Sequence, residues 1–291
     1  MSSTALFAIS TMIWGSTWLA ITFQLGVVPP EVSVVYRFAL AAVLLGAWCV
    51  ATGRSIAFAP RVHAWLAFWG AMMFGFNYVA VYYAEQHVSS GFVAVIFSTM
   101  VFMSPLGMRV FFGAALTARM FVAATLGVAG VALMFLPELR SAGGGGSAAA
   151  GMLWALAGTA IATGGNLAAV RNHAWGLPLL PATAWGMTWG AASAAVVALV
   201  QGVEWTFDAR MPYVLSLLYL TVFGSVAAFT AYLLLIRQVG AQPAAYVGVS
   251  TPVIAMALST IFEGYRWTPT AFAGVALAIA GNVMALRSGR K

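Results

Sequence analysis

The stretch VFFGAALTARMFVAATLGVAGVALMF, residues 110–135, decides the fold, because it recurs 151 residues later as IFEGYRWTPTAFAGVALAIAGNVMAL, residues 261–286. The identical pairs are Phe111 and Phe262, Gly113 and Gly264, Thr117 and Thr268, Phe121 and Phe272, Leu126 and Leu277, Ala129 and Ala280, and Gly130 and Gly281. Alanine and glycine matches are common in this chain, but phenylalanine, glycine and threonine at matched spacing are harder to obtain by chance. The sequence therefore predicts an internal repeat.

The composition predicts that lipid is the solvent for most of the surface. Hydrophobic residues make up 63% of the chain and charged residues only 7%, and the mean hydropathy is +0.95. Soluble domains carry about 25% charged residues, whereas a membrane-spanning helix needs about 20 mostly apolar residues. We therefore expect an all-α integral membrane protein whose main partner is the lipid bilayer.

Ten apolar runs lie between charges, prolines and glycine clusters, and each predicts a transmembrane helix. Their expected limits are 4–24, 32–52, 64–84, 90–112, 119–137, 150–170, 181–202, 212–235, 243–262 and 269–288. A glycine-rich stretch between the fifth and sixth runs reads as a flexible linker. The predicted organisation is a first five-helix repeat over 1–140, a linker over 141–149 and a second repeat over 150–291.

Because five is odd, the second repeat has to enter the membrane from the opposite side. Inverted repeats of this kind are typical of alternating-access transporters, which bind the substrate in a central cavity at the repeat interface near the bilayer midplane. The predicted fold is thus ten transmembrane helices arranged as two inverted five-helix repeats around a central cavity.

The basic residues predict the orientation of the chain. With a cytoplasmic amino terminus, nine arginines or lysines fall in cytoplasmic loops and the tail, and three arginines fall outside. This positive-inside bias places both termini in the cytoplasm, and all six acidic residues then lie at the outer side. The net charge of +7 is explained by orientation, so it does not indicate a nucleic-acid partner.

The motifs MIWGSTW (12–18), VVYRFALAAVLLG (34–46), GVAG (127–130) and AIAG (278–281) resemble the EamA-type drug/metabolite transporter superfamily. The resemblance covers essentially the whole chain and is greatest to the YddG-type amino-acid exporters. It implies export of small amino-acid-like metabolites across the bacterial inner membrane. The family's Gly–Glu pair after the fourth helix is altered here, since Glu263 precedes Gly264 and the first half has Phe112 instead.

Polar residues inside the predicted spans are the candidates for substrate binding, because such residues are costly in lipid. Interhelical hydrogen bonding is the alternative role for those in the first and sixth spans, and an aromatic interface belt is the alternative for Tyr82. The fourth- and ninth-span prolines weaken their helices and are candidate hinges. The substrate candidates are Trp14, Thr17, Asn77, Tyr78, Tyr82, Ser98, Thr99, Asn166, Tyr246 and Ser250, and the candidate hinges are Pro105 and Pro252.

Two charged residues are expected to have structural roles. Arg37 lies within the second span, and we expect it to reach the outer interface or to pair with Glu31 or an acidic loop residue. Glu263 is expected to form an ion pair with Arg266 in the loop before the tenth span. Small-residue stripes in the fifth and tenth spans predict close helix packing.

The sequence shows no catalytic, metal or cofactor motif. Cys49 is the single cysteine, and the three histidines lie at span ends. No acidic residue lies mid-span, Glu85 at the end of the third span coming closest, so we expect a facilitator for small amphipathic metabolites, most plausibly neutral or aromatic amino acids. A proton-coupled exporter of drugs, nucleosides or sugars, a channel and an intramembrane enzyme stay open as alternatives. The oligomeric state is open too, and a monomer is compatible with the sequence.

Overall fold

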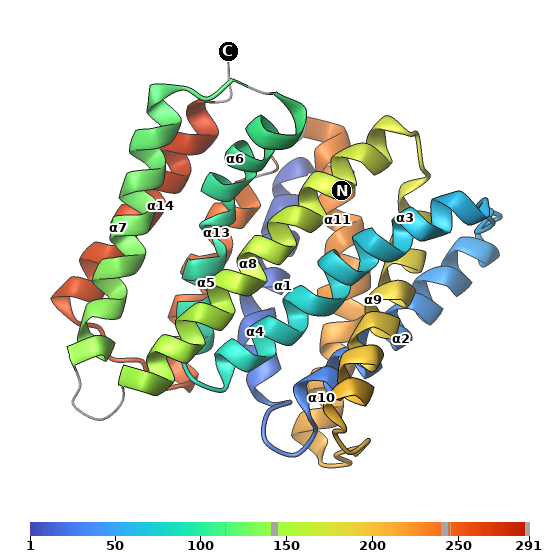
Figure 1. The fold of residues 1–291 in the computed structure, drawn as a ribbon, viewed down its shortest axis with the longest axis horizontal. Helices are drawn as coiled ribbons and strands as arrows, with labels where there is room; N and C mark the ends of the chain where they lie inside the picture. Colours follow the sequence, from blue (N-terminus) through green and yellow to red (C-terminus); the bar gives the residue numbers. More distant parts are fainter. Residues whose placement is uncertain (114, 141–144, 240–243, 245, 289–291) are drawn as a thin grey trace.

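The structure, a computed structural model, describes residues 1–113, 115–140, 145–239, 244 and 246–288, and every regular element in this part of the chain is a helix. Figure 1 shows them as one bundle. The helices are α1 (Ser3–Thr22), α2 (Pro30–Ala51), α3 (Pro60–Gly70), η1 (Ala71–Phe76), α4 (Asn77–Glu85), α5 (Ser90–Phe97), α6 (Met100–Phe112), α7 (Ala118–Arg140), α8 (Gly145–Ala174), α9 (Leu179–Gln201), α10 (Met211–Tyr219), η2 (Leu220–Ala227), α11 (Ala228–Val239), α13 (Tyr246–Phe262) and α14 (Pro269–Ser288).

Each of the ten predicted runs is mostly helical where the structure describes it, with turns at 23–24, 52, 98–99 and 202. Seven helical stretches are long and apolar enough to cross a membrane, namely Ser3–Thr22, Pro30–Ala51, Pro60–Glu85, Ser90–Phe112, Gly146–Asn172, Leu179–Gln201 and Met211–Ile236. Three further apolar helices of the described chain are shorter, namely Ala118–Met134, Tyr246–Phe262 and Pro269–Ala285. The chain is therefore a multi-pass helical membrane protein.

Proline and glycine set many of the helix limits. Pro30 and Pro60 are the first residues of α2 and α3, where the missing N–H of proline costs nothing because the first turn has no partner for it. Gly113 and Gly202 follow α6 and α9 with φ near +70°. Only glycine adopts this left-handed conformation without strain, and it ends a helix by satisfying the last carbonyls.

The predicted linker over 141–149 is partly wrong. Residues 141–144 lie outside the described residues, but α8 begins at Gly145 and already includes residues 145–149. The glycine content misled the prediction, because three alanines and the apolar helix that follows extend the helix backwards.

Two long spans contain a π-helical segment that the sequence did not reveal. In the third span η1 separates α3 from α4, and in the eighth span η2 separates α10 from α11. In a π-helical segment each backbone hydrogen bond joins residues five apart instead of four, and such segments often occur at functional sites. The fourth span is interrupted differently, by a turn at Ser98 and Thr99 between α5 and α6.

The α7 and α14 helices pack side by side along one edge of the bundle (Figure 1). A Cβ atom on Gly130 of α7 would lie 2.5 Å from the Gly274 carbonyl oxygen of α14, and the reverse distance is also 2.5 Å. The backbones therefore touch at this point, and the predicted small-residue stripes form a close helix interface.

The remaining helix contacts come in pairs across the two parts of the chain. The α2 helix packs against α9, α1 packs against α13 and α11, and α8 packs against α5, α6 and α4. In terms of predicted spans, the first contacts the ninth and eighth, and the sixth contacts the fourth and third. Exchanging the two halves of the chain maps the contacts of the first span onto those of the sixth, and it maps the α2–α9 contact onto itself.

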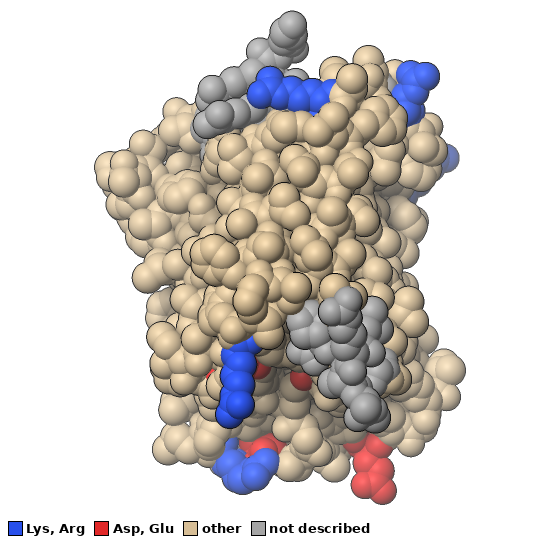
Figure 2. Space-filling model, turned by 90° about the vertical axis from the view of Figure 1, so that its left-hand side faces the viewer, with Lys and Arg blue, Asp and Glu red and all other residues tan. Residues whose placement is uncertain are grey.

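Charged side chains lie toward the two ends of the bundle. On the face in Figure 2, arginine side chains stand without acidic neighbours at the upper end, whereas acidic residues lie at the lower end beside basic ones. The one ion pair among the described residues, Asp208 with Arg210, is in the loop before α10 at 2.7 Å. Hydrogen bonds from the Arg210 side chain and backbone lower the pKa of the Asp208 carboxyl.

Candidate functional site

A cavity of about 920 Å³ lies between the two parts of the chain. Its wall is formed by α1, η1, α4, α5, α6 and the start of α7 from the first part, and by α8, α11, α13 and α14 from the second. A cavity of this size holds a small organic solute. The described lining contains tryptophan, tyrosine, asparagine and hydroxyl side chains but no charged one.

One end of this cavity is closed by apolar side chains. Trp18 of α1 and Phe97 of α5 meet edge to face with ring centroids 5.2 Å apart. Ile21 and Val81, both 2% exposed, form the wall beyond them. Solvent on this side therefore has no path into the cavity through these residues.

The opposite end reaches the surface of the molecule. Its wall includes Ala115 in the exposed turn before α7, Met120 at the start of α7 and Ala285 near the end of α14. Figure 1 places both chain termini in the upper half of the molecule, where α14 ends. The cavity is thus open at the end of the bundle that carries the carboxyl terminus.

Trp14 and Thr17 of the first span lie in the lining of the cavity. The Trp14 indole Nε1 donates to the carbonyl oxygen of Gly224 in η2 at 3.3 Å, and the ring packs against Phe229 and Tyr232. The π-helical segment therefore supplies a carbonyl that fixes the indole, while one side of the ring faces the cavity.

Asn77 and Asn166 lie in the lining on α4 and α8. The Asn77 side chain is 3% exposed, and its Oδ1 atom has no hydrogen-bond partner among the described residues. The Asn166 Nδ2 atom contacts the Met100 sulfur at 2.7 Å. A buried amide oxygen without a partner is a costly feature, and a polar solute in the cavity would satisfy it.

Ser98 and both predicted hinge prolines also line the cavity. The Ser98 hydroxyl donates to the Val95 carbonyl at 2.7 Å, so it presents lone pairs to a solute. Pro105 and Pro252 lack the N–H that would bond to the carbonyl four residues earlier.

Four predicted site residues lie outside the lining. Tyr82 is buried in the core, where its hydroxyl donates to Gln24 Oε1 at 2.6 Å. Thr99 donates to the Ile96 carbonyl at 2.6 Å, and Ser250 donates to the Tyr246 carbonyl at 3.0 Å. Helical spacing places Tyr82 on the face of Tyr78, but the closed end of the cavity separates it from the open space. Tyr246 is half-buried and also outside.

The expectation that Arg37 reaches the interface or pairs with an acid is wrong. Its side chain is 1% exposed, and it makes no ion pair with a described residue. The guanidinium lies 4.6 Å from the ring centroid of Tyr78, which lines the cavity, and Nε donates to Ser225 Oγ of η2 at 3.4 Å. A buried cation therefore stands directly behind the cavity wall and is held there by an aromatic ring.

The predicted ion pair of Glu263 with Arg266 is also wrong. The Glu263 carboxylate accepts from the backbone N–H of Ser90 at 3.0 Å and from the Ser90 hydroxyl at 2.5 Å. It thus caps the amino terminus of α5, where unpaired N–H groups and the helix dipole favour a negative charge. This contact joins the end of α13 to the start of α5 at the closed end of the bundle.

Sequence reasoning missed several lining residues. Phe229 and Tyr232 of α11 face Trp14, and Thr251 of α13 is in the wall one position after the predicted Ser250. The signal for Phe229 was its alignment with Asn77 of the third span at an offset of 152 residues. The methionines gave no periodic signal, but their flexible thioethers suit a wall that has to adapt to different solutes. They are Met73, Met100, Met108 and Met120.

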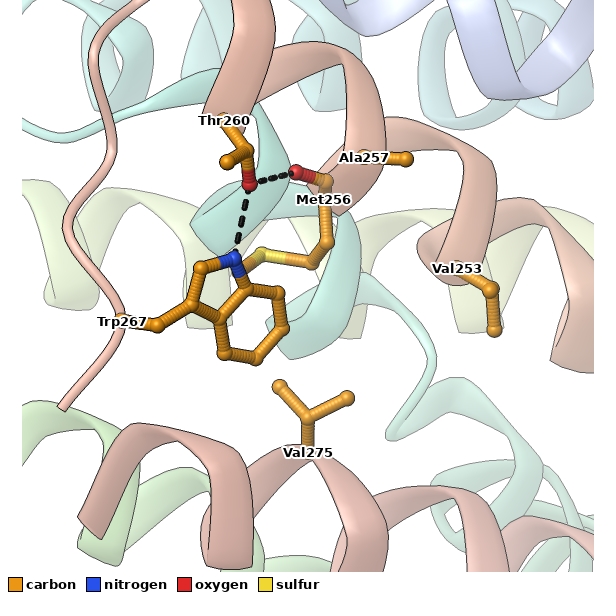
Figure 3. Close-up of a pocket in the computed structure, with 6 residues that line it drawn as sticks. All are labelled: Val253, Met256, Ala257, Thr260, Trp267 and Val275. Atoms are coloured by element: carbon orange, nitrogen blue, oxygen red, sulfur yellow. Dashed lines mark hydrogen bonds between the residues drawn. The ribbon is translucent and has the colours of Figure 1, made fainter. Parts of the chain in front are cut away.

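A second cavity of about 390 Å³ lies between α13, the following loop and α14 (Figure 3). The Trp267 indole N–H donates to Thr260 Oγ1 at 2.8 Å, and Thr260 in turn donates to the Met256 carbonyl. The wall is otherwise apolar, with Val253, Ala257 and Val275. Its polar groups are satisfied internally, so it offers little to a polar solute.

Comparisons with known proteins agree with this architecture. The chain matches the family described as "EamA-like transporter family" over residues 1–136 and 149–287. It is 29% identical over 263 residues to "Uncharacterized inner membrane transporter YedA" of Escherichia coli K12, across 89% of this chain and 82% of the relative. A protein of the same name in E. coli O157:H7 matches equally well. A solved structure called "Crystal structure of protein" has the same fold, with a TM-score of 0.67 at 19% identity over 100% of this chain and 99% of that one.

Proposed function

Because this chain belongs to the EamA-like transporter family, it is a membrane transporter, and we propose that it exports small amphipathic metabolites, amino acids in particular, by alternating access. The observation that carries this proposal is the cavity of about 920 Å³ between the two parts of the chain, open at one end and closed at the other. A carrier needs such a one-sided site, whereas a channel needs a continuous path.

We propose that the chain is built from two inverted five-helix repeats with ten membrane passages. The family matches at residues 1–136 and 149–287 support two similar halves. The paired helix contacts support a pseudo-two-fold relation, because α7 meets α14 and α2 meets α9, the corresponding fifth and second helices of each half. The two π-helical segments also occupy corresponding third helices.

The proposed location is the bacterial inner membrane, with both termini in the cytoplasm. The name of the E. coli relative supports the location, and the excess of basic residues in alternate loops supports the orientation. On this assignment the open end of the cavity faces the cytoplasm, from which an exporter takes up its substrate.

The chemistry of the wall favours a neutral or zwitterionic solute with an apolar part. Tryptophan, phenylalanine and methionine side chains supply apolar contact, while Asn77 and Asn166 supply a few polar atoms. Arg37 behind Tyr78 makes the wall electropositive on one side, which suits the carboxylate of an amino acid. The proposed substrate-binding residues are therefore Trp14, Thr17, Asn77, Tyr78, Ser98, Thr251 and Asn166, with Pro105 and Pro252 as hinges.

Transport of a panel of labelled amino acids by reconstituted vesicles tests this proposal. Tyr78→Ala removes a ring that forms the wall and rests on Arg37, so we expect transport to fall by about tenfold or more. Tyr219→Ala changes a half-buried tyrosine outside the lining and should transport like the wild type. Wild-type rates in Tyr78→Ala, or no transport of any amino acid by the wild type, would contradict the proposal.

A further inference from the structure

Glu85, the last residue of α4, is a carboxyl group buried without a partner. Its side chain is 7% exposed, and neither carboxyl oxygen has a hydrogen-bond partner among the described residues. An ionised carboxylate normally accepts several hydrogen bonds, and one left bare in a protein interior costs several kcal/mol by general estimates. A proton on the carboxyl removes this cost.

Two charged groups act on Glu85. One is the carboxylate of Glu263 and the other is the guanidinium of Arg37. Glu263 has the same charge as an ionised Glu85 and repels it, and Arg37 forms no ion pair with it, because the one ion pair among the described residues joins Asp208 to Arg210. Arg37 is itself held by the Tyr78 ring, so no fixed cation neutralises Glu85 directly.

Other titratable groups around Glu85 are already engaged or lie at the surface. Tyr82 donates to Gln24, and Tyr83 donates to Glu31 of α2. His87 in the next turn contacts Ser147 at 3.0 Å. In the loop after α13, Arg266 is exposed and Tyr265 packs against the core. No titratable side chain occurs in four neighbouring segments, namely α1, η1, α5 and residues 145–165 of α8.

The position of Glu85 links it to the closure of the cavity. Asn77, Val81 and Glu85 follow one another at four-residue spacing on α4, and the first two line the cavity. Glu85 therefore lies one turn beyond the closed end of the cavity. Glu263, which follows α13, holds the start of α5 through its hydrogen bonds with Ser90. Separation of α5 from α13 would break that cap and admit water to Glu85.

We propose that Glu85 is a proton-binding site of the transporter. Its carboxyl group holds a proton while the end of the cavity next to Val81 is closed, and it loses the proton when that end opens. This inference deepens the proposed transport function and rests on it. On opening, the O–H bond of the Glu85 carboxyl breaks, the electron pair stays on the carboxylate, and the proton passes to water at the newly opened face. The proton is thus the ligand, and transport is coupled to pH rather than purely facilitated.

Infrared spectroscopy of the reconstituted protein tests the site without any transported substrate. The wild type at neutral pH should show the carbonyl stretch of a protonated carboxyl group. Glu85→Gln should lack this band, and Glu204→Gln, which changes an exposed acid in the loop after α9, should keep it. The same band in the wild type and in Glu85→Gln would overturn the proposal. Should Glu85→Gln not fold, Glu85→Asp keeps a carboxyl and has to shift the band, and an unshifted band would count against Glu85.

Thiol labelling tests the link to opening. In a Cys49→Ser background, Ala94→Cys places a thiol at the closed end of the cavity, and an impermeant reagent is added on the side away from the chain termini. The rate is divided by that of an exposed reference thiol, Ala209→Cys in the loop before α10, which removes the pH dependence of thiol ionisation itself. If opening requires loss of the proton, this relative rate falls about tenfold for each pH unit of acidification below the titration of Glu85, and Glu85→Gln should have a low relative rate at every pH. A relative rate that is independent of pH in the wild type would overturn the link.

These two readouts separate the site from the transport function. A carboxyl band that depends on Glu85, together with labelling that depends on pH, supports the proton site even if the vesicles carry no amino acid. Amino-acid transport in a protein that lacks the band supports the transport function and overturns the proton site alone.

Discussion

Replacing Gly130 with valine should strongly destabilise the folded protein. A Cβ atom at this position would lie 2.5 Å from the Gly274 carbonyl oxygen and 2.6 Å from the Ala278 backbone nitrogen. These are backbone atoms, so no side-chain rotation relieves the clash and α7 has to move away from α14. Overpacking of this kind costs about 3 kcal/mol, a large part of a stability of roughly 5–15 kcal/mol. Thermal unfolding of the purified protein in detergent measures the loss.

Gly46→Val is the matched control for this prediction. Gly46 lies on α2, and a Cβ atom there meets nothing within 4 Å. The control should unfold near the temperature of the wild type. Equal unfolding temperatures for both variants would contradict the close α7–α14 contact.

Replacing Arg37 with leucine should reduce transport by about thirtyfold while the protein stays folded. The guanidinium rests on the Tyr78 ring, and it holds this ring of the cavity wall in place through a cation–π contact of about 2 kcal/mol. Where the substrate binds only to the ring in this position, loss of the contact weakens binding by up to the same free energy, which is a factor of about thirty. The substitution also removes the one positive charge that stands directly behind the described part of the cavity wall. Initial rates of amino-acid uptake into vesicles provide the measurement.

Arg266→Leu is the control for Arg37→Leu, because Arg266 is exposed in the loop before α14. It should transport at the wild-type rate. Gel filtration of both variants reports whether they fold. Wild-type transport by a well-folded Arg37→Leu protein would show that the buried charge has only a structural role.

The spans were predictable because their signals are local. Each signal lies within the helix that it delimits, whether it is the apolar run, a proline at the start or a glycine at the end. The limits of α2 or α9 can therefore be predicted from these signals alone. The α7–α14 interface was predictable for a related reason, since its small-residue stripes repeat at a spacing visible in both halves.

The roles of the charged residues were not predictable, because each depends on a partner far away in the sequence. Arg37 is held by Tyr78 and by Ser225, which is 188 residues later. Glu263 binds Ser90, which lies 173 residues earlier. The sequence shows Glu85 as an acid at the end of a helix, and only the folded structure shows that its side chain is buried.

Helical spacing finds the face that points toward the cavity but not the depth of the cavity. Trp14, Asn77 and Tyr78, chosen by their spacing, line the cavity, and their role in substrate binding stays a prediction. Tyr82 has the same spacing, but the cavity ends at Val81, one turn short of Glu85 on α4. Periodicity gives the direction of a side chain and not the depth at which a cavity closes.

Substrate counterflow tests most directly whether the one-sided cavity is a carrier site that opens to each face in turn. Vesicles containing the wild-type protein are preloaded with an unlabelled amino acid from the panel, and the labelled form is added outside. We predict transient accumulation of the label, with uptake faster than into empty vesicles, because a loaded carrier reorients with its substrate. Equal uptake with and without preloading, as a channel would give, would contradict the account.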